Sequence, residues 1–305
     1  RPRDPSQLVA DYLTDHEGIE TVAVEKFCGF STNSVLCFCI VTWNMNGRDV
    51  PKHNIANLLN EYLIETHSTN YLPSPSLLGE ATMQSLHLYV LGPKNSEFER
   101  KELRVDKCAV GGCGGLIRRK KGAVGVYIVI NRIHMVFISC HLSAHAHNVK
   151  ERNSQWRHIS YSLFAKNRSP YATASHVTVW LGDLNYRLHG ISTLAARSLI
   201  HKNLHSLLTS KDQLLQEAER GQVFRGYYCE GTLSFKPTYK YNVGSSNYDT
   251  QATRSEYLSW TDRILFKIDS SSGIDAVLHS YESQDQSSSS HRKPVKAHLC
   301  SRLNN

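Results

Sequence analysis

The chain has 305 residues, of which 40% are hydrophobic, and a formal net charge of +8. This length allows one large α/β domain, and the composition is that of a globular protein rather than a disordered one. No apolar run is long enough to span a bilayer, which excludes an integral helical membrane protein. The positive charge favours anionic partners such as nucleic acid, acidic lipid headgroups or polyphosphorylated small molecules.

Eight cysteines are scattered along the chain, several of them inside apolar runs such as Cys37-Phe38-Cys39. Cys108 and Cys113 flank glycines, but no second pair stands beside them at the spacing of a zinc site. We therefore expect buried, reduced thiols in a cytoplasmic protein rather than a disulfide framework.

Residues 1–33 are polar and irregular and are interpreted as an N-terminal tail or linker. The stretch from Ser34 to Asn44 is apolar and β-branched, which is typical of a strand buried on both faces. Further strands are predicted at residues 123–131, 134–141, 176–182, 264–268 and 274–280. Helices are predicted, from apolar residues at three-to-four spacing, at residues 54–65, 148–165 and 194–220. Interleaved strands and helices indicate a layered α/β domain.

A polar pair follows the predicted strand at residues 176–182. Asp183 and Asn185 stand two apart, so they lie on the same side of an extended chain. An acid beside an amide can deprotonate a water while donating a hydrogen bond to a developing oxyanion. Taken alone, an Asx-turn after a strand is the more frequent reason for such a pair.

Two other polar groups stand at strand ends. Asp262, in Trp260-Thr261-Asp262-Arg263, can orient a histidine as carboxylates do in catalytic pairs, or form a structural contact with Arg263. His141 and His145 stand four apart after a strand. They suit a metal, a phosphate group or a purely structural role.

Four segments in this order resemble the inositol polyphosphate 5-phosphatases of the endonuclease/exonuclease/phosphatase superfamily: residues 42–47, 141–145, 180–187 and 260–265. The resemblance runs from about Val35 to Cys300, so residues 34–305 are interpreted as one catalytic-type domain. It implies an α/β, DNase I-like fold, in which a two-sheet β-sandwich is flanked by helices in four layers. It also implies Mg²⁺-dependent hydrolysis of the 5-phosphate of phosphatidylinositol phosphates or soluble inositol polyphosphates.

The resemblance implies catalytic roles for several residues. Asn44 matches an amide at the metal and the scissile phosphate. Asp183 matches the base that activates the attacking water, and Asn185 the group that positions it. His141 matches a phosphate-contacting histidine, which His145 is near enough to support. Asp262, in turn, matches the carboxylate that holds the final catalytic histidine.

Substrate contacts are implied by a different stretch. Tyr239 and Lys240 match residues that contact the inositol 4-phosphate, although a half-exposed edge strand also explains this segment. Arg187 and Arg254 are further substrate-binding candidates. The cation and the proline that the family usually has before Trp260 are missing here, which leaves Arg254 as the nearest cation. The basic run at residues 118–121 suits an anionic membrane or a solvated turn.

The chain departs from the family pattern after Gly47. The family has a helix and a strand between this point and a Gln-Glu-Val-Pro motif, whose glutamate binds Mg²⁺. Here Asp49-Val50-Pro51 follows almost at once, and no parallel crossover fits into so few residues. The sequence therefore predicts the loss of one helix and one central strand, and Asp49 is the candidate metal ligand in place of the glutamate.

A second departure concerns the final histidine of the family, which stands in Ser-Asp-His-(Lys/Arg)-Pro-Val. Aligned on Lys293-Pro294-Val295, Arg292 occupies the position of that histidine. Aligned on the preceding serines, His291 fills the role after a slip of one residue, although such a slip normally reverses the side-chain direction. His291 is kept as the catalytic candidate.

Two alternatives to a 5-phosphatase remain. One is a catalytically impaired homologue that binds phosphoinositides or a protein partner without turnover. The other is a nuclease of the same superfamily, which the positive charge would suit. Arg187 and residues 238–241 favour inositides, and no aromatic platform for bases stands out, so no nucleic acid is expected as a partner. We expect a monomer that uses Mg²⁺ and contacts anionic membranes peripherally.

Overall fold

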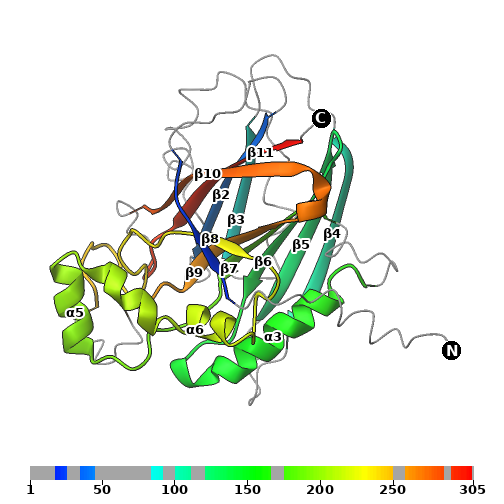
Figure 1. The fold of residues 1–305 in the computed structure, drawn as a ribbon. Helices are drawn as coiled ribbons and strands as arrows, with labels where there is room; N and C mark the ends of the chain where they lie inside the picture. Colours follow the sequence, from blue (N-terminus) through cyan, green and yellow to red (C-terminus); the bar gives the residue numbers. More distant parts are fainter. Residues whose placement is uncertain are drawn as a thin grey trace.

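The computed structural model describes residues 18–25, 35–44, 84–91, 100–110, 121–165, 175–249, 258–284 and 290–303. Within these ranges, two β-sheets form a sandwich with helices on the outside (Figure 1). The larger sheet has the strand order β1-β8-β9-β7-β6-β5-β4, and the smaller has the order β10-β11-β2-β3. The predicted sandwich with flanking helices is therefore confirmed, while the helix predicted at residues 54–65 lies outside the described residues.

The larger sheet consists of β1 (Glu20–Val22), β4 (Arg100–Val110), β5 (Lys121–Ile130), β6 (Ile133–His141), β7 (Val177–Asp183), β8 (Cys229–Gly231) and β9 (Asp262–Ile268). The smaller sheet consists of β2 (Val35–Asn44), β3 (Gln84–Leu91), β10 (Ile274–Ser283) and β11 (Val295–Leu303). The helical segments are η2 (Ala146–Asn148), α3 (Val149–Ser162), α5 (Thr193–His201), η4 (His205–Lys211), α6 (Gln213–Glu219) and η6 (Ser270–Ser272). No helix in these described ranges has the length and apolarity needed to cross a membrane.

The main core lies between the two sheets. Alternate residues of each strand point inward, such as Phe38 of β2, Phe137 of β6 and Leu299 of β11, all at most 1% exposed. A second core lies between the larger sheet and the helices, where Trp180 of β7 joins Ile159 of α3. Burial on both faces explains why β5, β6 and β7 read as nearly continuous apolar runs.

The edge of β2 is covered. The sequence predicted that a central strand beside β2 is missing, which would leave unpaired backbone groups. In the structure, β2 pairs with β11 on one side and with β3 on the other, both antiparallel. Among the described residues, β3 therefore occupies the place beside β2 without any parallel crossover.

Residues 18–25 belong to the folded unit, although the sequence placed them in a tail. β1 pairs in parallel with β8, and the Glu25 N–H donates to the carbonyl of Leu278 at 2.9 Å. A three-residue edge strand is too short for its hydrophobic pattern to predict it.

The single helix predicted at residues 194–220 is wrong. The chain forms α5, η4 and α6 instead, because Asn203, with a φ of 57°, ends the first helical run and Asp212 begins the last. Its carboxylate accepts from the Leu215 N–H at 3.1 Å and caps α6, as an Asp at the N-cap commonly does. The same carboxylate receives Arg263 of β9 at 3.0 Å, and Arg263 also pairs with Glu230 of β8 at 2.5 Å. This fully buried ion cluster ties α6 to the larger sheet.

Two cysteines are not reduced, contrary to the expectation from the sequence. Cys37 of β2 and Cys300 of β11 form a disulfide. The antiparallel register places them directly opposite one another, with Cα atoms 4.0 Å apart. Their sequence separation of 263 residues hides this pairing from any pattern along the chain.

Candidate active site

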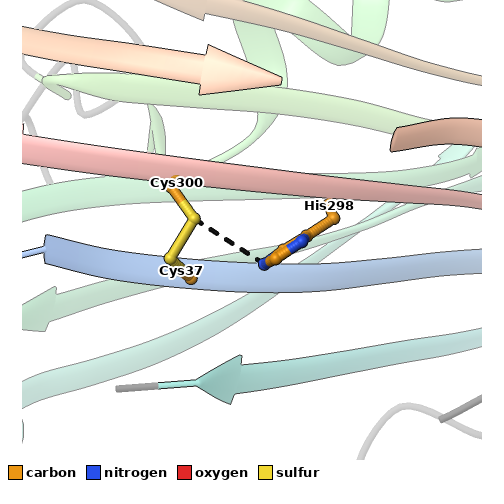
Figure 2. Close-up of side chains that lie close together, drawn as sticks. All are labelled: Cys37, His298 and Cys300. Atoms are coloured by element: carbon orange, nitrogen blue, oxygen red, sulfur yellow. Dashed lines mark hydrogen bonds between the residues drawn. A yellow bond between two sulfur atoms is a disulfide. The ribbon is translucent and has the colours of Figure 1, made fainter. Parts of the chain in front are cut away.

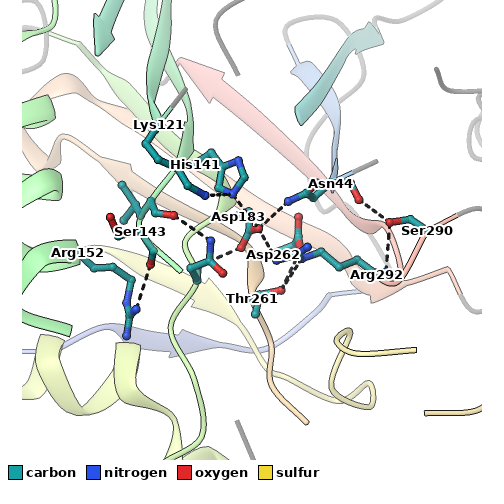
Figure 3. A network of polar contacts seen from close by, with 12 residues as sticks. Asn44, Lys121, His141, Ser143, Arg152, Asp183, Thr261, Asp262, Ser290 and Arg292 are labelled. Carbon is teal, nitrogen blue, oxygen red and sulfur yellow. Dashed lines mark hydrogen bonds and ion pairs between the residues drawn. The ribbon is translucent and has the colours of Figure 1, made fainter. Parts of the chain in front are cut away.

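Three strands of the larger sheet deliver polar side chains in one row. β6 and β7 are parallel, so their carboxyl ends meet at the same edge, and β9 begins there because it runs antiparallel to β7. His141, Asp183 and Asp262 are consecutive partners in this register. Asn44, at the end of β2, reaches the row from the smaller sheet (Figure 3). The four segments that carry the family resemblance therefore converge on one site.

Asp183 is the centre of the site. Its side chain is fully buried, and Oδ2 accepts from Asn44 Nδ2 at 2.7 Å and from an Arg292 guanidinium nitrogen at 2.7 Å. Nε2 of His141 lies 3.3 Å from the same oxygen. A buried carboxylate with an amide and a cation as partners is stabilised in its ionised form.

Asn185 is fixed beside Asp183 by its own backbone. Its φ of 58° lies in the left-handed region, which asparagine tolerates better than most residues. The Asn185 N–H donates to Asp183 Oδ1 at 3.2 Å, so the Asx-turn considered from the sequence does form. Its Nδ2 donates to the Leu142 carbonyl at 2.9 Å, and Arg187 donates to its Oδ1 at 2.6 Å. The Asx-turn is therefore what places Asn185 at the site.

Arg292, not His291, reaches the two aspartates. Its guanidinium bridges Asp183 at 2.7 Å and Asp262 at 3.3 Å, and it donates to Thr261 Oγ1 at 3.2 Å. His291 instead contacts the Tyr241 carbonyl through Nδ1 at 2.9 Å. The placement of His291 at Asp262 is therefore not observed, because adjacent residues of an extended segment point in opposite directions.

Two contacts fix this register. The Ser290 hydroxyl donates to the Asn44 carbonyl at 2.7 Å, and Trp43 Nε1 donates to the Arg292 carbonyl at 3.0 Å. The Lys293-Pro294-Val295 alignment was thus the right anchor. It was the one signal in the sequence that pointed to Arg292, while nothing in the sequence singled out Ser290 or Thr261.

The charges of the site shift its acids in opposite directions. Burial opposes ionisation of Asp183, but Arg292, followed by His141 and Lys121, holds the pKa of this carboxyl below its usual range. Burial and the neighbouring Asp183 charge raise the pKa of Asp262 to about 7, although Arg292 counteracts them. Two acids with separated pKa values share one guanidinium, and Asp183 is the one that is fully ionised near neutral pH.

His141 lies between Asp183 and a lysine. Nζ of Lys121 contacts His141 Nε2, and His141 Nδ1 is buried without a hydrogen-bond partner. Burial, with Lys121 and Arg292, lowers the pKa of His141 to about 3, although Asp183 opposes this, so the imidazole is neutral near pH 7. Lys121 is the last residue of the basic run interpreted as a membrane contact or a turn. The structure directs it into the site instead.

Only some of the residues predicted to bind substrate contact the site in the structure. Tyr239 lies between two guanidiniums, 4.6 Å from that of Arg187 and 4.5 Å from that of Arg292. Arg187 is itself buried and supports Asn185, so it is not exposed toward a substrate. Lys240 pairs with Asp249 at 2.8 Å. Of this group, Tyr239 is the one that contacts the site directly.

His145 does not join the cluster. The His145 ring is exposed and stacks on His147 at 5.7 Å, because its loop turns away from the strand end. Asp49 and Arg254 lie outside the described residues.

The donor set suits a hard divalent cation. Asn44, Asp183 and Asp262 supply only oxygen ligands, as Mg²⁺ and Ca²⁺ prefer. Asp262 Oδ1 is buried and has no hydrogen-bond partner, which is the state of an oxygen that awaits a ligand. Arg292 contacts Oδ2 of both Asp183 and Asp262 and would have to share these two oxygens with the cation.

Comparison with known proteins agrees with this geometry. Residues 51–298 match the model of endonuclease/exonuclease/phosphatase family 2. The chain is 48% identical to the type IV inositol polyphosphate 5-phosphatase 11 of Arabidopsis thaliana, over 98% of this chain and 92% of that protein. It is 34% identical to human synaptojanin-1 over 63% of this chain, a match that covers 12% of the longer protein.

A solved structure shares both sequence and fold. The inositol polyphosphate 5-phosphatase domain of SPsynaptojanin, in complex with inositol (1,4)-bisphosphate and a calcium ion, superposes with a TM-score of 0.64. It is 27% identical and covers 83% of this chain and 69% of that domain. The sandwich and its polar row define a member of the endonuclease/exonuclease/phosphatase family 2. Within it, the chain belongs to the inositol polyphosphate 5-phosphatases.

Proposed function

We propose that this protein hydrolyses the 5-phosphate of phosphatidylinositol phosphates or soluble inositol polyphosphates. The observation that carries the proposal is the convergence of Asn44, His141, Asp183 and Asp262 on one buried row. The activity is assigned to the catalytic-type domain, to which residues 18–25 also contribute a strand. A relative named as an inositol polyphosphate 5-phosphatase, matched over nearly the whole chain, supports this assignment.

The residues of the site divide the work of phosphate hydrolysis. Asp183, the last residue of β7, accepts a proton from the attacking water. It can do so because its carboxyl group is ionised. Asn185 positions that water. His141, Lys121 and Arg292 surround Asp183 with hydrogen-bond donors and positive charge, which would stabilise negative charge on the phosphoryl oxygens.

Arg292 changes the character of the site. Where the family has a histidine, this chain has a guanidinium whose pKa is raised by Asp183 and Asp262 despite burial. It therefore keeps its charge at every working pH and cannot exchange a proton. In this chain the group paired with Asp262 is a fixed cation that binds phosphate.

A divalent cation completes the proposal. Asn44, Asp262 and, outside the described residues, Asp49 are the ligands proposed for Mg²⁺. When bound there, the ion would withdraw negative charge from the phosphoryl oxygens. The 4-phosphate of the substrate is assigned to Tyr239 and Lys240, and Lys240 would exchange its contact with Asp249 for the phosphate.

The test is phosphate release from inositol 1,4,5-trisphosphate and from vesicles that contain phosphatidylinositol 4,5-bisphosphate, with Mg²⁺ and with a chelator. Metal-dependent loss of the 5-phosphate alone, identified in the product, is expected. The two substrates distinguish a soluble from a membrane-bound ligand. No release above an Asp183→Asn blank from folded protein would leave a non-catalytic homologue that binds phosphoinositides.

Replacement of Arg292 by Gln is expected to move the acid limb of the kcat/KM–pH profile to higher pH. The positive charge of Arg292 is the largest influence that lowers the pKa of Asp183, so its removal lets this carboxyl protonate at higher pH. A general base is active only above its pKa, so kcat/KM of the variant would rise at a higher pH than that of the unchanged chain. Profiles of phosphate release measure this shift.

The matched control is Arg302→Gln, which removes an arginine paired with Asp275 at 3.4 Å on the exposed side of β10 and β11. Its profile should equal that of the unchanged chain. An acid limb that stays in place in the Arg292 variant would mean that this guanidinium does not set the ionisation of the base.

A further inference from the structure

The outer face of the smaller sheet carries sulfur and imidazole side chains at one place. Core residues such as Phe38 and Leu299 point inward, so the alternate residues of β2 and β11 point outward. In the antiparallel register Cys37 lies opposite Cys300, and Cys39 lies opposite His298. Cys37 precedes Asn44 by most of the length of β2, roughly 20 Å at the usual rise of a strand, so this group is separate from the active site.

Three ligand atoms of this group are mutually close. The sulfurs of Cys37 and Cys300 and a ring nitrogen of His298 all lie within 4.8 Å of one another (Figure 2). The Nε2 atom of His298 is 3.6 Å from Cys300 Sγ. In a tetrahedral zinc site, with Zn–S bonds of about 2.3 Å and Zn–N bonds of about 2.0 Å, ligand atoms are roughly 3.5–3.8 Å apart. The histidine–cysteine pair already has this spacing.

A second histidine lies beside this group of three. His279 stands at an irregularity in β10 between Leu278 and Ser280, and its ring lies 5.2 Å from that of His298. Such a bulge commonly redirects a side chain. His279 Nδ1 contacts the Glu25 carbonyl at 2.7 Å, which leaves Nε2 with the lone pair, and Nε2 is buried without a hydrogen-bond partner. Histidines that bind metals are held by a carbonyl in this way.

We propose that the reduced chain binds one zinc ion through Cys37, Cys300 and His298, with His279 in the fourth position. The disulfide seen in the structure is the oxidised, metal-free form of the same site. Thiolate and imidazole ligands select zinc rather than magnesium, whereas the oxygen ligands around Asp183 do the opposite. The two sites would therefore not compete for the same ion.

Conversion of the disulfide form to the zinc-bound form requires two electrons and releases two protons to water. A dithiol reductant supplies two electrons and two protons, so the bond between Cys37 and Cys300 breaks, two thiols form and the reductant becomes a disulfide. Zinc then binds both sulfurs and the two thiol protons pass to water. Opening of the disulfide also lets the sulfurs move apart to the separation that zinc requires.

The test compares zinc uptake by the whole chain in two states. One sample is reduced with a phosphine, which is then removed, and the other is left oxidised. A chromophoric chelator reports zinc affinity, and Co²⁺ serves as a spectroscopic probe. The reduced chain should take up one more equivalent of zinc than the oxidised chain, and its Co²⁺ complex should show sulfur-to-cobalt charge-transfer absorption.

Variants locate the ion. Cys37→Ser and His298→Gln should each weaken zinc binding at least tenfold, a typical range for loss of one ligand or its support. His298→Gln keeps both cysteines, so it separates metal binding from disulfide formation. His279→Gln should also weaken binding. Cys229→Ser, which removes a free thiol from β8, should leave it unchanged.

Equal zinc uptake by the reduced and oxidised chains would overturn the proposal. So would unchanged affinity in His298→Gln, or a loss of the same size in Cys229→Ser, when circular dichroism shows that the variants are folded. Unchanged affinity in His279→Gln alone would overturn only the assignment of the fourth ligand.

Discussion

Asp183→Asn is expected to lower kcat/KM for 5-phosphate hydrolysis by roughly 10²- to 10⁴-fold, the usual contribution of a general base. The amide has the shape of the carboxylate and can still accept the Asn185 N–H at the turn, but it cannot take a proton from water. The substitution keeps the size of the side chain but removes the buried charge paired with Arg292, so the fold of the variant has to be checked. Phosphate release under saturating Mg²⁺ measures the loss, and circular dichroism confirms the fold.

Asp275→Asn is the matched control for this substitution. Asp275 is an exposed acid of β10 that pairs with Arg302 away from the site, so its loss should leave the rate within twofold. Equal rates for Asp183→Asn and the unchanged chain would show that Asp183 is not the base. Hydrolysis by this chain would then need a different explanation.

Arg263→Met is expected to lower the free energy of unfolding by about 3–5 kcal/mol, the cost of breaking a buried ion cluster by removing one partner. Arg263 is fully buried, and its loss would leave Asp212 and Glu230 as neighbouring carboxylates without a cation. The Tyr281 hydroxyl would still donate to Glu230 at 2.7 Å, but it carries no charge. Denaturation in urea, followed by circular dichroism, measures the change.

Arg302→Met is the control for the buried cluster. The side chains of its ion pair with Asp275 are 30% and 51% exposed, so the loss should be within about 1 kcal/mol. A similar change in the two variants would mean that burial of Arg263 adds nothing. The two variants should differ in stability because of solvent. Water screens the surface ion pair and can hydrate the group left behind, but it cannot reach the buried cluster.

Much of the sandwich is visible in the sequence. The strands β2, β5, β6, β7 and β9 were predicted within a few residues, because strands buried on both faces are continuously apolar. The start of β10 was also predicted, although only Ile274, Leu278 and Tyr281 of this strand are buried. The short strands β1 and β8 carry too little pattern. The residues from 194 to 220 read as one helix because hydrophobic periodicity passes through Asn203 and Asp212, although Asp212 caps the last helix.

Some residues of the site were likewise predictable from the sequence, and others were not. Asn44, Asp183, Asn185 and Asp262 were found from motifs in which a polar residue follows or opens an apolar strand. The fixed cation Arg292 was only one of two readings, since side-chain direction on an extended segment depends on a one-residue register. Lys121 was assigned to a membrane or a turn, because its position beside His141 arises from the pairing of β5 with β6.

The sequence alone therefore determined the family and the layered fold and predicted the acids and amides that meet at the candidate site, because these follow from local patterns and ordered motifs. Tertiary structure decided which residue pairs with Asp262, where β3 lies and that Cys37 meets Cys300. Each of these depends on register between strands that are distant along the chain. Register is set by packing of whole sheets, which no local stretch of sequence encodes.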